Sequence, residues 1–274
     1  MSSSSLFKPS LNSYATLSTG ILSNISLNSY ATLHRLSSNY PIGKQRKLEE
    51  WPADIKLILD KLGINDFYVS GLSAGCVHAF TVAYAFKERI LGIGVNTPTA
   101  PFSAENALTQ MAPITKYLRI IMEYPYIGDM LAYLMSKMTA KQRMEAAPDV
   151  AKALNKMLRL KEPWMIRAYD GYISDQTRGV VKGHRGWCDN MYNINEDLPF
   201  PTNELDFVSE KGLKFVITSA KDDTTNPPRM QQYWAESIKG VEIIHREEGY
   251  GHLHGSVPSC FDEIFRKMVG APKK

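Results

Sequence analysis

The chain has 274 residues, of which 44% are hydrophobic and 22% charged, and its formal net charge is +4. This composition is that of an ordinary globular protein, and the length suits one large domain or a domain with an insertion. The charge is mild and the basic residues form no stripe, which argues against nucleic acid as a partner. Because no uninterrupted apolar run of about 18 residues occurs, no membrane-spanning helix is expected.

The first forty or so residues are dominated by Ser, Asn, Thr and Leu. The octapeptide SLNSYATL occurs there twice, starting at Ser10 and at Ser26. Two copies are too few for a repeat fold, which needs about three units to bury a core. We therefore predict a poorly ordered, Ser-rich leader over 1–43, or a start replaced by unrelated sequence, and an ordered domain over 44–274.

The sequence predicts a cytoplasmic protein. Cys76, Cys188 and Cys260 are far apart and fit no CxxC spacing, so we expect reduced thiols rather than a disulfide framework. The N-terminus lacks the charged start and compact apolar segment of a secretory signal. A Ser-rich start whose first acidic residue is Glu49 has a weak similarity to an organelle transit peptide.

Ordered structure is expected to begin near Leu48 with a strand–helix–strand unit. Apolar residues recur at helical spacing from Leu48 to Leu62, and Gly63 is placed to end that helix. The run 67–70 has strand character, a helix is expected over 77–86, and 90–95 reads as another buried strand. This order predicts a βαβ unit in a mostly parallel sheet and therefore an α/β fold.

The pattern changes to all-helical between about 101 and 200, where Pro148 and Pro163 open two of the expected helices. We predict that this stretch is a helical insertion. The alternation of strands and helices then resumes, with a strand over 213–219, a helix over 229–238, a strand over 241–245 and a last helix over 261–269.

One motif carries chemistry. Gly71-Leu-Ser73-Ala74-Gly75 matches G-x-S-x-G, directly after an expected strand and before an expected helix, which is the context of a nucleophile elbow. So tight a turn needs small neighbours and exposes the serine hydroxyl beyond the sheet. Ser73 is the predicted nucleophile, and Ala74 can donate its backbone N–H to a developing oxyanion.

A serine hydroxyl is a weak nucleophile and needs a base, which is itself oriented by a carboxylate. Gly249-Tyr-Gly-His252 forms a glycine-rich turn after the strand 241–245, so His252 is the preferred base and His254 the rival. His245 lies within the strand and is read as structural. Two histidines at i and i+2 without further ligands do not predict a metal site.

The acid should follow the strand before the base. Asp222 and Asp223 both lie in the loop after the strand 213–219, and the residues alone leave either as the partner of the imidazole.

With these motifs the chain resembles the α/β-hydrolase superfamily over about 44–269. The family's acid loop commonly reads G-x-x-D-x-x-V-P-P, and the ungapped match to 220–228 places the acid at Asp223. Its G-x-G-H turn places the base at His252, and its helical cap falls on 101–200.

The resemblance implies acyl chemistry without a cofactor or metal. A serine at the elbow differs from the aspartate of the epoxide hydrolase and haloalkane dehalogenase branches. The implied reaction is cleavage of an ester, thioester or amide in a small-molecule acyl substrate, which the apolar residues of the cap suggest is partly apolar. Acyl transfer to another acceptor uses the same residues.

The sequence departs from the family before the elbow. Few structured residues precede Ser73, and no His-Gly dipeptide that would supply a second oxyanion donor is present there. The sequence therefore predicts an N-terminally incomplete sheet with an exposed edge at 67–70, poor solubility and impaired activity. The alternative is a non-catalytic or truncated homologue, acting as a binding module or an inactive product.

Overall fold

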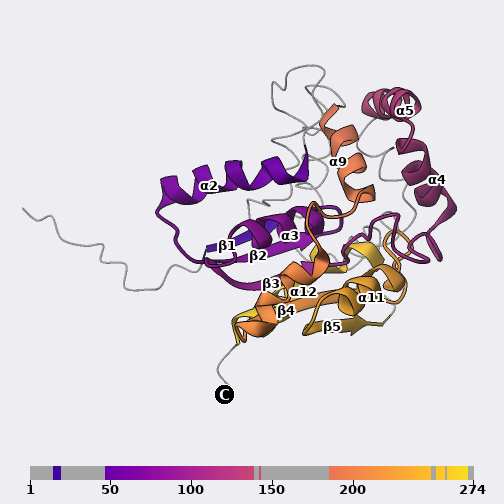
Figure 1. Cartoon of the computed structure of the whole chain (residues 1–274). Coiled ribbons are helices and arrows are strands. Elements are labelled where there is room, and N and C mark those ends of the chain that lie inside the picture. The colour runs from indigo at the N-terminus through magenta and orange to yellow at the C-terminus, as the bar shows by residue number, and fades with distance from the viewer. Residues whose placement is uncertain are drawn as a thin grey trace, which may run out of the picture.

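A computed structural model of the protein describes residues 15–19, 47–138, 142, 185–247, 251–256 and 258–270. Within these ranges the strands form one five-stranded sheet in which neighbours in sequence are neighbours in space and every pair is parallel (Figure 1). The strands are β1 (Ala15–Thr19), β2 (Phe67–Leu72), β3 (Ile90–Asn96), β4 (Lys214–Ala220) and β5 (Val241–Arg246).

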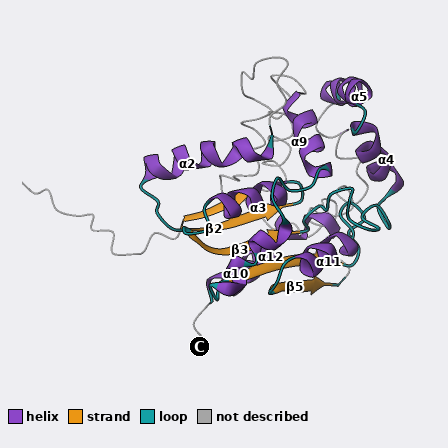
Figure 2. Ribbon diagram, viewed as in Figure 1, coloured by secondary structure: helices purple, strands orange, loops and turns teal. Residues whose placement is uncertain are grey.

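Helices connect the strands and flank the sheet (Figure 2). The α-helices are α2 (Trp51–Leu62), α3 (Gly75–Ala85), α4 (Pro113–Met122), α5 (Pro125–Lys137), α9 (Arg185–Asn195), α10 (Phe207–Glu210), α11 (Pro228–Ser237) and α12 (Pro258–Val269). Short 3-10 helices lie at η1 (Leu48–Glu50), η2 (Thr202–Leu205) and η3 (Gly251–Ser256). The strands and helices predicted over 48–96 and 213–269 are all present, with small shifts at their ends.

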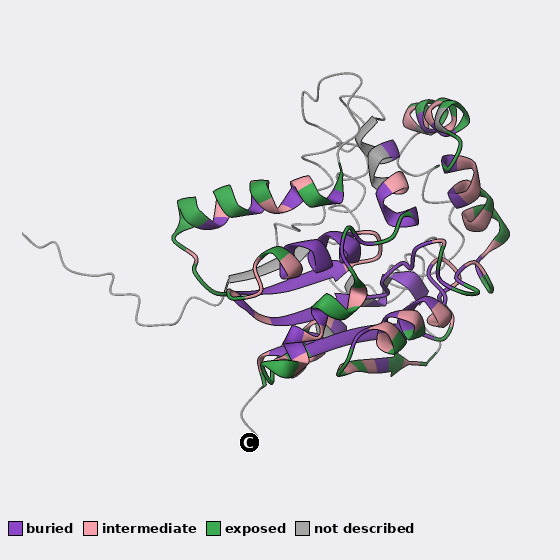
Figure 3. Ribbon diagram, in the orientation of Figure 1, coloured by how far each residue is buried: buried purple, intermediate pink, exposed green. Residues whose placement is uncertain are grey.

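One face of the sheet carries the main hydrophobic core. Because side chains alternate along a strand, Val69, Ile93 and Ile217 point to the same face. They are buried there with Phe80 of α3 and Trp234 of α11, whose rings lie 4.8 Å apart in an edge-to-face contact. The central strands are buried along their length, whereas α2 exposes its outer side (Figure 3).

The opposite face is covered by α12, which approaches the sheet closely. Gly94 of β3 has no side chain, and a Cβ there would lie 2.8 Å from Cγ2 of Ile264, inside van der Waals contact. Ile264 is fully buried with Val216 and Ile244. The glycine therefore sets how near this helix lies to the sheet.

The helical insertion between β3 and β4 contains α4, α5 and α9, which pack on one another on one side of the molecule (Figure 1). No strand occurs in its described part, 101–138 and 185–200. The helices expected at Pro148 and Pro163 lie outside the described residues.

A buried arginine joins the insertion to the sheet domain. Arg119 of α4 is 3% exposed, and its guanidinium donates to Asn195 Oδ1 at 2.8 Å and to the Ala100 carbonyl after β3 at 2.9 Å. Burial lowers the pKa of Arg119 to about 10, against the raising effect of Glu123, so the group remains charged at neutral pH. Its hydrogen bonds replace the water that burial removes.

The expectation of an exposed sheet edge at 67–70 is wrong. Ala15–Thr19, which lie within the predicted leader 1–43, form β1 and pair in parallel with Phe67–Gly71. A strand with unpaired N–H and C=O groups is a ready partner for another extended segment. In the structure β2 is thus an interior strand, and β1 lies at the edge that was expected at 67–70.

Cys76, Cys188 and Cys260 are buried, and none of them is joined to another in a disulfide. Over the described ranges, no helix has the length and hydropathy needed to span a membrane.

Candidate active site

Ser73 occupies the turn between β2 and α3 in a strained backbone conformation. Its φ is 54°, in the left-handed region that non-glycine residues rarely adopt. The Ser73 N–H donates to the Asn96 carbonyl at 2.9 Å, so the turn is tied to the end of β3. Such strain persists where the surroundings enforce it, and it is common at active sites.

Ala74 lies where an oxyanion donor would be needed. It is the N-cap residue of α3, and the first N–H groups of a helix have no carbonyl partner one turn earlier. The helix dipole adds a favourable field for negative charge at this end. Its role as a donor remains a prediction.

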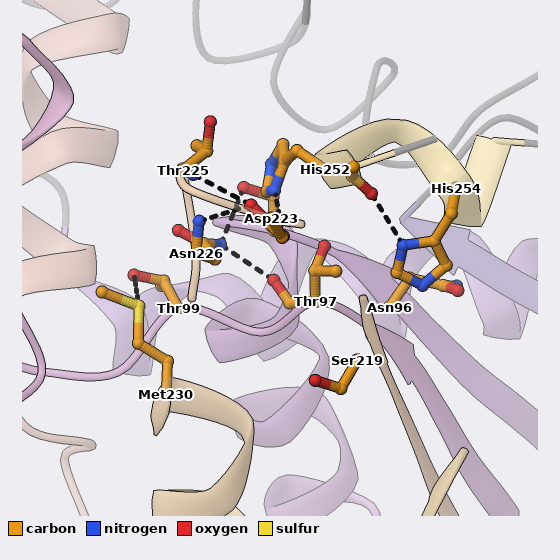
Figure 4. Close-up of polar contacts among 12 residues, drawn as sticks. Asn96, Thr97, Thr99, Ser219, Asp223, Thr225, Asn226, Met230, His252 and His254 are labelled. Atoms are coloured by element: carbon orange, nitrogen blue, oxygen red, sulfur yellow. Dashed lines mark hydrogen bonds and ion pairs between the residues drawn. The ribbon is translucent and has the colours of Figure 1, made fainter. Parts of the chain in front are cut away.

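The acid loop brings Asp223 and His252 into direct contact. Asp223 Oδ2 lies 2.9 Å from His252 Nδ1, and both side chains are buried, with 0% and 7% of their surface exposed (Figure 4). The other carboxylate oxygen, Oδ1, accepts the backbone N–H groups of Thr225 and Asn226 at 2.9 and 2.8 Å. The carboxylate therefore organises its own loop while it orients the imidazole.

This contact fixes the chemistry of the imidazole. A carboxylate only accepts hydrogen bonds, so a neutral His252 donates from Nδ1 to Asp223. With the proton on Nδ1, Nε2 is the unprotonated nitrogen, which is the tautomer required of a general base.

The rival residues take other positions. His254 Nδ1 lies 2.9 Å from the Gly251 carbonyl, and Nε2 lies 2.7 Å from Oγ1 of Thr218 in β4. Both ring nitrogens therefore have hydrogen-bonding partners. Burial lowers the pKa of His254 and favours its neutral form. His245 is exposed on β5, and the carboxylate that contacts His252 belongs to Asp223, not Asp222.

Sequence reasoning missed Asn226, which links the acid loop to the elbow. Its side-chain Nδ2 donates to the Thr97 carbonyl at 2.8 Å and lies 3.3 Å from Ser73 Oγ. The signal was present in the loop pattern, because Asn226 stands where the family commonly has valine. A polar residue at a buried, usually apolar position indicates a specific hydrogen-bonding role.

Thr97, the partner of Asn226, is also strained. It follows β3 with a φ of 43° and is fully buried. Its hydroxyl has no hydrogen-bond partner among the described residues. A β-branched residue in this conformation with a buried unpaired hydroxyl is costly, so the surrounding contacts must hold it.

The described residues contain no group of three or more His, Cys, Asp or Glu side chains that could hold a metal ion. The polar groups gathered at this end of the sheet are the hydroxyl of Ser73, the imidazole of His252, the carboxylate of Asp223 and the amide of Asn226.

Comparison with known proteins supports the fold. No protein-family model matches the sequence, and no curated protein gives a significant match. Among solved structures, the chain is similar to MGS-M2, an alpha/beta hydrolase enzyme from a Medee basin deep-sea metagenome library. The TM-score is 0.59 at 16% identity, over 94% of this chain and 89% of that one.

Two further solved structures show the same similarity. A hydrolase from Oleispira antarctica matches with a TM-score of 0.53 at 16% identity, over 86% of this chain and 76% of that one. A thermophilic esterase from Thermogutta terrifontis matches with a TM-score of 0.52 at 17% identity, over 84% and 75%. The chain therefore has the α/β-hydrolase fold.

Proposed function

We propose that the protein is a serine hydrolase that cleaves an ester, thioester or amide bond with Ser73, His252 and Asp223. The observation that carries the proposal is that the loop after β4 contacts both the turn that bears His252 and the turn that bears Ser73. Asp223 binds the His252 imidazole, and Asn226, three residues on, binds the Ser73 hydroxyl oxygen. The similarity to solved hydrolases of the same fold supports it as an analogy.

In the proposed reaction, Ser73 Oγ attacks the substrate carbonyl carbon while its proton passes to His252 Nε2. Asp223 stabilises the imidazolium, and the Ala74 N–H stabilises the oxyanion. The imidazolium then gives its proton to the leaving group, and an acyl-enzyme ester remains on Ser73. Water attacks that ester with His252 again as base, releases the acid and restores the serine.

The substrate is proposed to be a small molecule with a partly apolar acyl group. Support comes from the helical insertion, where α4 and α5 present large apolar side chains at their surface: Ile114, Tyr117, Tyr126, Ile127, Met130, Tyr133 and Leu134. Apolar side chains with a few polar groups are typical of sites for such substrates.

The test is covalent labelling of the full chain with a fluorophosphonate probe, which reacts with activated serines. Wild-type protein should be labelled, and Ser73→Ala and His252→Gln should abolish labelling. His245→Gln is the matched control, because His245 is exposed on β5 and should leave labelling unchanged. A folded wild-type chain that takes up no label would favour the non-catalytic alternative instead.

A further inference from the structure

Asn226 is a buried polar residue placed at the reacting oxygen by three separate contacts. It is 4% exposed, and its backbone N–H donates to Asp223 while its side chain contacts Thr97 and Ser73. Figure 4 shows Asn226 between Asp223 and Thr97, with dashed lines to both. The residue therefore connects the acid loop, the end of β3 and the nucleophile.

The orientation of the Asn226 amide follows from its partner. The Thr97 carbonyl can only accept a hydrogen bond, so the amide group 2.8 Å from it must be the NH₂ and not the oxygen. That nitrogen carries two hydrogens in a fixed plane. One is used by Thr97, and the second is left for Ser73 Oγ at 3.3 Å.

The backbone around Asn226 limits how it can move. Asp223 Oδ1 holds its N–H, and Pro227 and Pro228 follow directly, which fixes their own φ angles. The Asn226 carbonyl accepts Nε2 of Gln231 at 3.2 Å, and the same nitrogen donates to the Pro98 carbonyl at 3.0 Å. The amide side chain itself is held by the Thr97 carbonyl, and its backbone N–H by Asp223, before any substrate binds.

We propose that Asn226 is a catalytic residue of the serine reaction, donating a hydrogen bond from Nδ2 to Ser73 Oγ. The inference rests on the proposed function, since it assigns a role around the same nucleophile. A donor to Oγ favours the negative charge that develops there as the proton leaves for His252. It also places an oxygen lone pair in a fixed direction.

The same hydrogen bond acts in both halves of the reaction. In acylation Oγ forms its bond to the carbonyl carbon and loses its proton to His252. In deacylation the bond from that carbon to Oγ breaks, and Oγ takes the bonding electron pair and then the proton from His252. The Asn226 N–H stabilises Oγ each time it carries negative charge, so both steps should depend on it.

The first experiment measures single-turnover labelling of the full chain by a fluorophosphonate over a range of probe concentrations. Asn226→Val, which restores the residue of the family pattern, should lower the maximal rate constant about 10- to 100-fold, the range for losing a hydrogen bond to a charged group. The half-saturating probe concentration should stay within about twofold, because Asn226 contacts the reacting oxygen and not the bound probe. Asn226→Asp keeps the shape without the N–H and should be slowed as well.

Gln231→Met is the control for a merely structural role. It removes the bonds from Gln231 to the Asn226 and Pro98 carbonyls in the same loop but leaves the Asn226 side chain its contact with Ser73. Melting temperatures of all variants would be measured alongside. We expect Gln231→Met to lose stability while it keeps the maximal labelling rate within a few fold.

Two results would overturn the assignment. One is an Asn226→Val or Asn226→Asp protein that folds and reacts at the wild-type rate. The other is a rate loss in Gln231→Met as large as in Asn226→Val at equal loss of stability, which would make the loop and not the N–H responsible. Absence of labelling in the folded wild type would instead refute the proposed function itself.

Discussion

The strand-end loops and the helical insertion use buried polar groups in different ways. In the loops, Asp223 contacts His252, Asn226 contacts both Asp223 and Ser73, and the backbones of Ser73 and Thr97 are strained. In the insertion, the buried cation of Arg119 binds amide and backbone oxygens of neighbouring segments. The first arrangement is the one that we propose to be catalytic, and the second connects the helices of the insertion to the end of β3.

The sheet and the helical insertion also differ in how far their apolar side chains are exposed. The central strands β2, β3 and β4 are buried over most of their length, whereas α4 and α5 leave large apolar side chains exposed, among them Tyr126 at 92% and Tyr117 at 61%. Large apolar patches at a surface often mark binding sites, whereas buried apolar residues are the norm in any core. We therefore propose that the loops carry out the reaction and that the insertion contacts the substrate.

The largest effect should come from the acid. Asp223→Asn keeps the shape but offers an amide to His252 Nδ1, which favours the wrong tautomer, and we expect kcat on a p-nitrophenyl ester to fall about 10⁴-fold. Asp222→Asn is the adjacent control and should retain most activity. If the Asp222 variant loses more activity than the Asp223 variant, the acid has been assigned to the wrong residue.

A substitution in the insertion should lower the stability of the protein rather than its activity. Arg119→Ala removes a buried cation and leaves the carbonyls of Asn195 and Ala100 unpaired, which should lower the free energy of unfolding by about 2–5 kcal/mol. Urea denaturation would measure this, with the neighbouring Lys116→Ala expected to change it by no more than about 0.5 kcal/mol. Equal stability of the two variants would mean that Arg119 does not fasten the insertion.

The smallest expected effect is that of His254 on how the free energy of unfolding changes with pH. Burial lowers its pKa in the folded protein below the usual value of 6.5, so the unfolded chain binds the extra proton first as the pH falls. This contribution to stability is complete above about pH 6.5 and is lost as the pH falls toward the lower folded pKa.

His254→Gln should therefore reduce the loss of unfolding free energy between pH 8 and pH 5, measured by denaturant titration at each pH. The wild type should show the steeper loss. A difference of the opposite sign would show that the folded protein prefers the charged imidazole.

Much of the sheet domain could be predicted from the sequence because its signals are local. Apolar runs, helical spacing from Leu48 to Leu62 and the small residues around Ser73 each act over a few residues, and the structure contains the corresponding elements. The strand β1 could not be found this way. Ala15–Thr19 has little apolar character, and its pairing with β2 depends on what lies beside it in space.

The sequence by itself determined the types of group at the site, because G-x-S-x-G, the acid loop and the G-x-G-H turn each have a local signature. Tertiary structure decided which groups meet. Asp222 and Asp223 are the same residue type in the same loop, and only the folded structure shows that the Asp223 carboxylate contacts His252. Asn226 and Ser73 are 153 positions apart, so their contact exists only once the parallel strands bring both loops to one edge of the sheet.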